Sequence, residues 1–252
     1  MAGDIAARLR RLTPARVGLG RTGAGQTTTD ILAFALAHAR ARDAVHEALD
    51  VDALGADVAA LGHPVWRVQS AAADRQTYLL RPDLGRVLAA GTILGPAGPV
   101  DLAIVLADGL SARAARTHAV SLLASLVPRL EDITLGAVTI ATQARVALGD
   151  EIARRLAARA VLVLIGERPG LSSPDSLGAY LTFDPRPGRT DAESNCVSNI
   201  RPEGLGYDEA ASKITWLVRE AIRRQRSGVD LKDDSNVARL ATGALAIDSS
   251  PT

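Results

Sequence analysis

The sequence is poor in several residues on which large classes of protein depend. It contains a single cysteine, Cys196, which excludes an intrachain disulfide and fits a reducing compartment. Aromatic residues make up only 3% of the 252 residues and hydrophobic residues 47%, so the core must be built from aliphatic side chains. No apolar run approaches the roughly 20 residues needed to cross a bilayer, and the N-terminus lacks the apolar segment of a secretory signal. We therefore expect a soluble cytoplasmic protein without a membrane segment.

An excess of charge of one sign is also missing. The chain has 29 basic and 28 acidic residues, which gives a net charge of +1. A nucleic-acid-binding domain usually combines a basic excess with interleaved aromatic residues, and neither is present here. The four histidines show no metal-ligand spacing. The composition therefore predicts neither a nucleic-acid interface nor a metal site.

The side chains that could act as nucleophiles have no visible partners. Ser111 and Ser172 follow predicted strands, but neither lies in a G-x-S-x-G motif, and no histidine follows His118. A lone cysteine such as Cys196 is usually a buried, inert thiol. Glu167, next to an arginine, is by default part of a solvated turn. The absence of a self-sufficient catalytic set favours a binding subunit that contributes one wall of a site completed by a partner.

Short apolar runs alternate with helical segments along most of the chain. The run at 160–165 is rich in valine and isoleucine and is typical of a strand buried on both faces. This alternation predicts an α/β fold with a Rossmann-like, largely parallel sheet, helices on both faces and an N-terminal helical extension. The expected strands cover residues 65–70, 102–106, 137–142, 160–165, 180–183 and 196–200.

Three of these strands are followed by residues that could form a binding site. The strand ends fall near Asp108, Val146 and Glu167. Because the carboxyl ends of parallel strands meet at one edge of a sheet, these residues are expected to gather there. That edge is where α/β folds bind their ligands.

Local signals predict several further helices. After the turn at 166–170, the Ser-Ser-Pro-Asp stretch at 172–175 is expected to cap a helix. The Arg-Pro-Asp-Leu-Gly-Arg stretch at 81–86 is expected to form a turn that leads into another helix. Residues 207–226 have the spacing of an amphipathic helix.

Residues 18–23 contain a literal G-x-G-x-x-G pattern. Such a loop binds a dinucleotide when a strand precedes it and a helix follows it. A helix over 27–49 is expected, but Pro14 leaves no room for the strand. We favour a flexible, cationic loop that caps the helix, and an NAD-linked oxidoreductase remains an alternative.

The string GERPGLSSPDSLGAY at 166–180 is the most distinctive stretch of the sequence. RVALGDEI precedes it at 145–152, and NCVSNIRPEGL follows it at 195–205. Together they resemble the small subunit, or light chain, of ethanolamine ammonia-lyase, a carbon–nitrogen lyase that depends on adenosylcobalamin. Shorter matching strings extend the resemblance over roughly Arg16 to Lys232.

The resemblance implies a cofactor site and a division of the chain. In the family, the residues that match Val146, Glu167 and Cys196 contact cobalamin. A Rossmann-like cobalamin-binding domain is then expected at 51–232, after a helical segment with the glycine-rich loop at 1–50 and before a flexible tail at 233–252. The chain has no D-x-H-x-x-G motif, so the cofactor is expected to keep dimethylbenzimidazole on its cobalt.

The resemblance also implies a partner. In the family, a large subunit with a TIM-barrel fold binds ethanolamine and holds most catalytic groups, and the hetero-oligomer converts ethanolamine to acetaldehyde and ammonia by radical chemistry in ethanolamine catabolism. No catalytic residue is therefore expected on this chain. Family members often reside in a bacterial microcompartment. A non-catalytic scaffold subunit that has lost the cofactor remains a further alternative.

Overall fold

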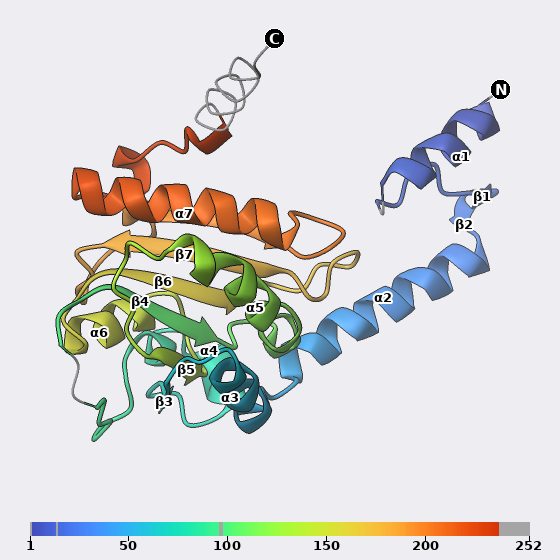
Figure 1. The fold of residues 1–252 in the computed structure, drawn as a ribbon. Coiled ribbons are helices and arrows are strands. Elements are labelled where there is room, and N and C mark those ends of the chain that lie inside the picture. The colour runs from blue at the N-terminus through green and yellow to red at the C-terminus, as the bar shows by residue number, and fades with distance from the viewer. Residues whose placement is uncertain (1, 14, 96–97, 237–252) are drawn as a thin grey trace, which may run out of the picture.

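A computed structural model describes residues 2–13, 15–95 and 98–236, and its centre is a six-stranded sheet of order β3-β5-β4-β6-β7-β8 (Figure 1). The first four strands in this order are parallel, whereas β7 and β8 each run antiparallel to their neighbour. The α/β class with a largely parallel sheet is thus confirmed. The strands are β3 (Val65–Gln69), β4 (Val100–Ala107), β5 (Val138–Thr142), β6 (Ala158–Gly166), β7 (Leu177–Phe183) and β8 (Ser194–Ile200).

Helices cover both faces of the sheet, as the sequence predicts. Helices α3 (Val51–Ala60), α5 (Ala112–Leu126) and α7 (Tyr207–Arg224) pack on one face, and α6 (Leu148–Arg155) packs on the other. Strand β6 shows why both faces need cover: Leu162 and Leu164 join the core under α5 and α7, while Val161, Val163 and Ile165 join the core under α6. The apolar run at 160–165 is therefore buried on both faces.

The α6 side of the sheet is incompletely covered. Helix α7 packs on the opposite face of β7 and β8, and α6 packs on β6. On the α6 side, Tyr180 is therefore only half-buried, and Cys196 and Ser198 are exposed. The last two strands thus present an open shelf next to α6.

Two local predictions are wrong. The stretch at 172–175 caps no helix: the Glu167 amide donates to the carbonyl of Ser176 (2.9 Å), and the chain returns as the antiparallel strand β7. The connection between β6 and β7 is also shorter than the dozen or more residues that a parallel crossover needs. The stretch at 81–86 does not lead into a helix either. The helix α4 (Arg75–Leu80) comes before this stretch, which itself ends in the short 3₁₀ turn η1 (Leu84–Arg86).

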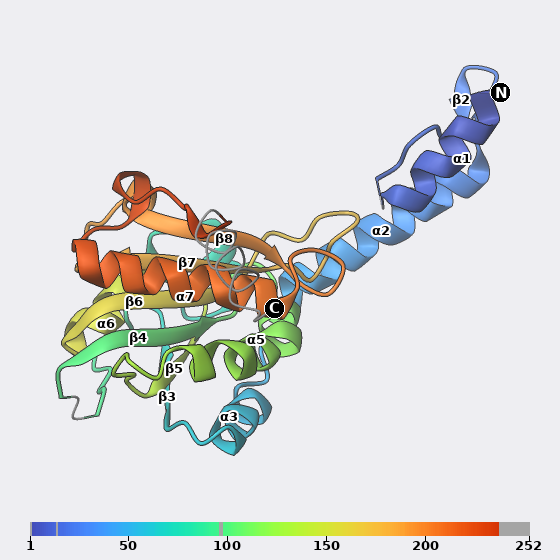
Figure 2. The ribbon, with the colours of Figure 1, turned by 45° about the horizontal axis from the view of Figure 1, so that its top comes forward.

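The N-terminal extension is helical, as predicted. It contains α1 (Ala2–Leu12), the two-residue strands β1 (Arg21–Thr22) and β2 (Gly25–Gln26), and α2 (Thr28–His46). Helix α2 projects from the sheet and holds α1 and the hairpin at its far end (Figure 2). The domain boundary at residue 50 stays a prediction, and most of the predicted tail lies outside the described residues.

No helix in the described ranges has the length and apolar character to cross a membrane. Three 3₁₀ turns complete the secondary structure: η2 (Val127–Arg129), η3 (Asp191–Glu193) and η4 (Gly228–Asp230).

Candidate functional site

The carboxyl ends of β4, β5 and β6 lie side by side, as predicted. Ala107 is aligned with Ala141 of β5 on one side and with Ile165 of β6 on the other. The segments that follow, starting at Asp108 and Gln143 and at Glu167, therefore leave from one edge of the sheet.

Asp108 joins two of these segments. Its side chain is 2% exposed, and its two carboxylate oxygens accept hydrogen bonds from the backbone amides of Gln143 (2.8 Å) and Ala144 (3.0 Å). Burial raises the pKa of Asp108, and the hydrogen bonds from these amides oppose that rise. Gln143 has a φ of 53°, which a side chain other than glycine seldom adopts. Asp108 thus stabilises the bend from which the loop carrying Val146 departs.

Tyr78 forms the base of the same region. It is fully buried, its hydroxyl donates to the carbonyl of Ala144 (3.2 Å), and burial raises its pKa to about 12. The guanidinium groups of Arg145 and Arg75 lie 4.2 Å and 4.7 Å from the centre of its ring. Stacked arginines bind such a ring through its negative face. The loop at 144–146 is therefore held by a buried ring that also contacts two arginine side chains.

Glu167 is not a solvated turn residue, contrary to the default expectation. Its carboxylate accepts hydrogen bonds from the hydroxyls of Ser176 (2.5 Å) and Ser198 (2.6 Å) and from the backbone amide of Asn199 (3.3 Å). Gly178 lies directly against it, since a Cβ atom there would be 2.9 Å from Glu167 Oε1. The carboxylate is thus held in one position at the rim of the shelf.

Two of the three predicted cofactor contacts line one hollow. Val146 and Glu167 border a cavity of ≈ 460 Å³, together with Tyr78, Arg145 and Tyr180. Val146 follows β5 and Glu167 follows β6. The fold thus places side by side two residues that are 21 positions apart in the sequence. Tyr180 of β7 connects the lining of the hollow with the shelf.

Cys196 lies next to this hollow, on the shelf itself. It is aligned with Tyr180 across the β7–β8 ladder, and Tyr180 lines the hollow. The thiol is exposed, so the expectation of a buried cysteine is wrong. Desolvation by the surrounding protein nevertheless raises the pKa of Cys196, a hydrogen bond with Tyr180 opposes the rise, and the charge of Glu167 adds to it. The thiol therefore stays neutral and lacks the character of an activated nucleophile.

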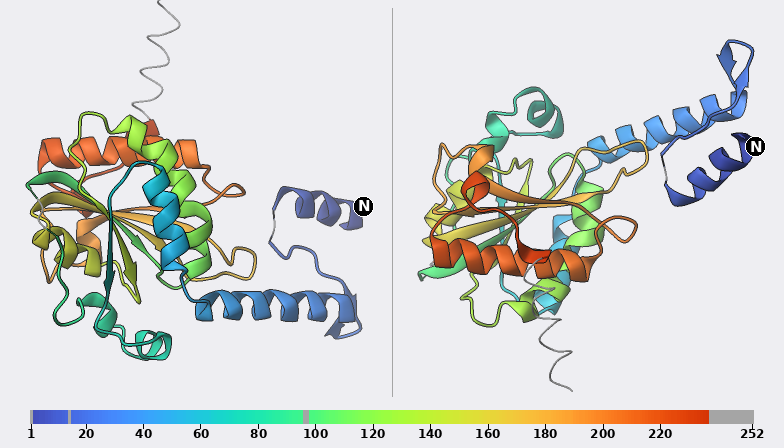
Figure 3. Two further views of the ribbon diagram at one scale, coloured as in Figure 1. Left: turned by 60° about the horizontal axis from the view of Figure 1, so that its bottom comes forward. Right: turned by 90° about the horizontal axis from the view of Figure 1, so that it is seen from above.

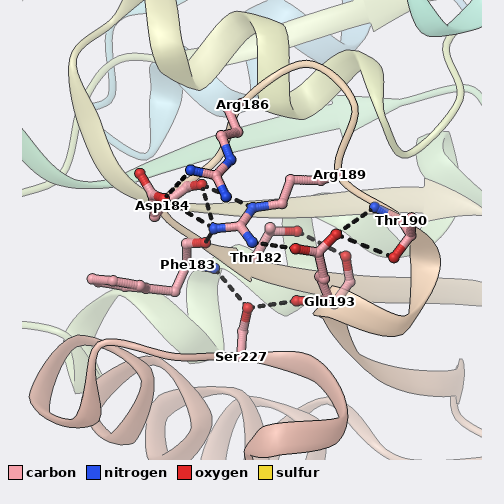
Figure 4. A network of polar contacts seen from close by, with 9 residues as sticks. Thr182, Phe183, Asp184, Arg186, Arg189, Thr190, Glu193 and Ser227 are labelled. Carbon is pink, nitrogen blue, oxygen red and sulfur yellow. Dashed lines mark hydrogen bonds and ion pairs between the residues drawn. The ribbon is translucent and has the colours of Figure 1, made fainter.

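A second hollow is bordered by Ala147, the residue directly after Val146. It has a volume of ≈ 700 Å³ and is also bordered by Arg86 and the loop at 187–191. Figure 4 shows how that loop is fixed: Arg189 pairs with Asp184 (3.0 Å) and with Glu193. The loop at 187–191 is thus a fixed wall that borders the shelf at the end opposite Glu167.

Asp150 lies behind this wall, in the first turn of α6. It is 5% exposed, and burial raises its pKa to about 7, while the positive charge of Arg189 opposes the rise. The nearby hydroxyl of Thr182 on β7 also opposes the rise in the pKa of Asp150.

The chemistry of the first hollow suits a large, amide-bearing ligand. Val146, Ile165 and Tyr180 offer apolar surface, and the Glu167 carboxylate can accept hydrogen bonds from amide groups. Arg145, which borders the hollow, has a buried Nε atom without a hydrogen-bond partner among the described residues. Such orphaned atoms are rare unless a ligand or water completes them. In the described part of the chain, no group of three metal-ligating side chains comes together.

Sequence reasoning missed Tyr78 and Tyr180. Tyr180 could have been found from strand periodicity. It lies two residues after Gly178, so in a strand both residues are on the same face, which here is the face of the shelf. Tyr78 carries none, because its contact with Ala144 joins residues 66 positions apart.

Comparison with known proteins gives a consistent result. The sequence model of the ethanolamine ammonia-lyase light chain matches residues 3–232. The chain is 59% identical to the ethanolamine ammonia-lyase small subunit of Bradyrhizobium diazoefficiens over 234 residues, which is 90% of each chain. It is 58% identical to that of Rhodopseudomonas palustris over 233 residues, covering 90% of this chain and 89% of the relative. The small subunit of Ralstonia nicotianae is 53% identical over 244 residues, covering 93% and 90%.

Proposed function

Since the chain belongs to the ethanolamine ammonia-lyase light-chain family and is thus the small subunit of this lyase, we propose that it binds adenosylcobalamin jointly with the large subunit. The complex then converts ethanolamine to acetaldehyde and ammonia. One observation carries the proposal: Val146 and Glu167 border a single hollow, and Cys196 lies beside Tyr180, which borders it too.

Each of these residues has a chemical role toward the cofactor. Val146 supplies apolar contact, Glu167 accepts hydrogen bonds from amide arms, and Cys196 supplies a neutral thiol on the open shelf. Adenosylcobalamin, when bound, supplies radical chemistry through its cobalt–carbon bond. None of the four histidines belongs to the described lining of the hollow, which supports a cofactor that keeps dimethylbenzimidazole on cobalt.

The part that this chain plays in the reaction is binding and orientation. The cofactor-facing groups are fixed before a ligand arrives: three hydrogen bonds hold Glu167, and Asp108 holds the loop of Val146. A fixed wall lowers the cost of ordering the site on binding. We assign the catalytic groups to the large subunit, a TIM barrel in our proposal, which closes the open side of the hollow and excludes water. The proposed location is the cytoplasm, with a bacterial microcompartment as a second possibility.

The nucleotide alternative receives no support from the arrangement of the glycine motif. Residues 18–23 lie between α1 and α2, far along the extension, and the helix or strand that precedes them in the described residues is α1 (Figure 1). The strand on which a dinucleotide-binding loop depends is missing from that described segment.

The proposal is tested by acetaldehyde release from ethanolamine with adenosylcobalamin. The samples are this chain alone, the large subunit alone, and the two chains co-expressed, and turnover is expected only from the third. A co-purified complex that binds no cobalamin would instead establish the scaffold alternative.

A variant tests the assigned role of Glu167. Glu167→Gln removes one acceptor position, so the Kd of the complex for cobalamin is expected to rise about tenfold, which corresponds to about 1.4 kcal/mol. Glu131→Gln is the matched control, because Glu131 is exposed and borders a hollow next to η2. Equal affinity of the two variants would remove Glu167 from the site.

A further inference from the structure

The N-terminal arm, which we define as residues 2–46, has little contact with the rest of the chain. In both views of Figure 3, α2 extends outward from the sheet, and α1 lies at the far end. Ala44, near the end of α2, is the buried residue of that 19-residue helix. The arm therefore gains little stability from packing on its own domain, although helices in proteins draw most of theirs from such packing.

The first half of α2 exposes large apolar side chains. Ile31, Leu32 and Leu36 are 51%, 64% and 53% exposed. Leu32 and Leu36 are four residues apart, so they lie on one side of the helix, and Ile31 and Ala35 form the adjoining row. A contiguous apolar surface of this kind marks an interaction site.

The arm is also strongly basic. Residues 2–46 contain seven arginines and three aspartates, whereas the whole chain has a net charge of only +1. Among the described residues, no carboxylate lies within ion-pair distance of Arg16, Arg40 or Arg42. A partner with an apolar groove and acidic rims would complement this surface.

The root of the arm is attached next to the hollow. Arg75 donates from Nε to the carbonyl of Val45 (2.6 Å) and from Nη1 to the carbonyl of Gly109 (2.8 Å), and it stacks on Tyr78, which borders the hollow. Glu47, directly after the arm, pairs with Arg113 (2.7 Å). The arm therefore leaves the domain from the edge of the sheet at which the cofactor site lies.

We propose that this arm is the docking element for the large subunit, which receives the apolar surface of α2 in an acidic-rimmed groove. This inference rests on the proposed function, in which the large subunit also closes the hollow. Continuity favours this occupant, because the arm starts at the edge that the large subunit must cover. A second copy of this chain bound to the arm would occupy the same side of the molecule and compete with that partner.

The test is recovery of the complex from co-expressed full-length chains, with a tag on the large subunit. The arm variant is Leu32→Glu with Leu36→Glu, which keeps a good helix former at both positions. The matched control is Val229→Glu, since Val229 is 82% exposed in η4, which bonds to Asn195 at the start of β8, away from the hollow. Circular dichroism of each isolated small subunit checks that folding is retained.

The arm variant is expected to lower the recovered small subunit at least tenfold, while the control is recovered like the wild type. In limited trypsin digestion, cleavage at the arm arginines is expected to be rapid in the isolated chain and suppressed in the complex. Wild-type recovery of the arm variant, or equal cleavage with and without the large subunit, would overturn the proposal.

Two further outcomes separate the possible explanations. If the arm variant converts the isolated chain from a dimer to a monomer while recovery with the large subunit is unchanged, the arm binds a second copy and the proposal is wrong. If the wild-type complex forms and protects the arm but takes up no cobalamin, judged by its absorption spectrum, the proposed function fails while the docking inference stands.

Discussion

Replacing Asp108 by asparagine is expected to destabilise the protein and loosen the loop of Val146. The two oxygens of Asp108 each accept a backbone hydrogen bond, from Gln143 and from Ala144. An asparagine side chain presents one oxygen and one NH₂ group, so one of the two buried amides must face a donor. A buried donor left without an acceptor costs about 1–3 kcal/mol.

Loss of the negative charge has two opposite effects: it removes the attraction to Arg75, and it relieves the desolvation that raises the pKa of Asp108. Arg75 Nη1 lies 3.7 Å from the carboxylate, and both side chains are largely buried. Breaking a buried ion pair costs about 3–5 kcal/mol, but Arg75 keeps its bonds to two carbonyls, so only part of that cost applies. We expect a total of about 2 kcal/mol, mainly from the unpaired amide, or a fall in Tm of roughly 4–8 °C.

A control on the same strand makes the test specific. Asp101, at the other end of β4, accepts from the amide of Thr134 (3.1 Å) and from Arg159 (2.8 Å), but its side chain is 25% exposed. Because water can replace these partners, Asp101→Asn is expected to cost less than about 1 kcal/mol. Urea unfolding of both variants followed by circular dichroism measures the difference. Equal destabilisation by the two substitutions would refute the argument from burial.

Two further substitutions test the shelf and the wall. Gly178→Ala would place a Cβ atom 2.9 Å from Glu167 Oε1, so it is expected to displace the carboxylate and raise the Kd for cobalamin about tenfold. Gly136→Ala is the control and should leave the Kd unchanged, because its Cβ atom would lie 3.5 Å from the nearest neighbouring atom. Burial raises the pKa of Asp150 from 3.8 to about 7, so its contribution to stability is fully present below pH 3.8 and is lost as the pH rises through about 7. Asp150→Asn, which does not titrate, is therefore expected to exceed the wild type by roughly 1–3 kcal/mol in urea unfolding at pH 8; an equal gain at pH 4 would contradict this.

The sheet was predictable where burial on both faces dictates the residues. The apolar run at 160–165 has no polar alternation, and only a central strand between two helical layers can bury it. The direction of β7 was not predictable, because the cap signal at 172–175 is local. It competes with the bond between the Glu167 amide and Ser176, which forms only when β7 returns along β6.

The candidate site was predictable only in part. The gathering of Asp108, Val146 and Glu167 follows from parallel strands ending at one edge, and this much could be argued from spacing. The position of Cys196 beside Tyr180 depends on the register of an antiparallel pair. The contact of Tyr78 with the loop of Val146 depends on packing between distant segments. Neither relation leaves a periodic signal in the sequence.

Arg75 supports two structures at once, since it holds the root of the arm at Val45 and the ring of Tyr78 under the hollow. Arg75 is thus the side chain through which docking of the arm and binding in the hollow would be coupled. By linkage, any free energy with which docking of the arm favours cofactor binding must return as tighter docking once the cofactor is bound. The cofactor would then hold the two subunits together more strongly, and a subunit pair that has lost its cofactor would separate more readily.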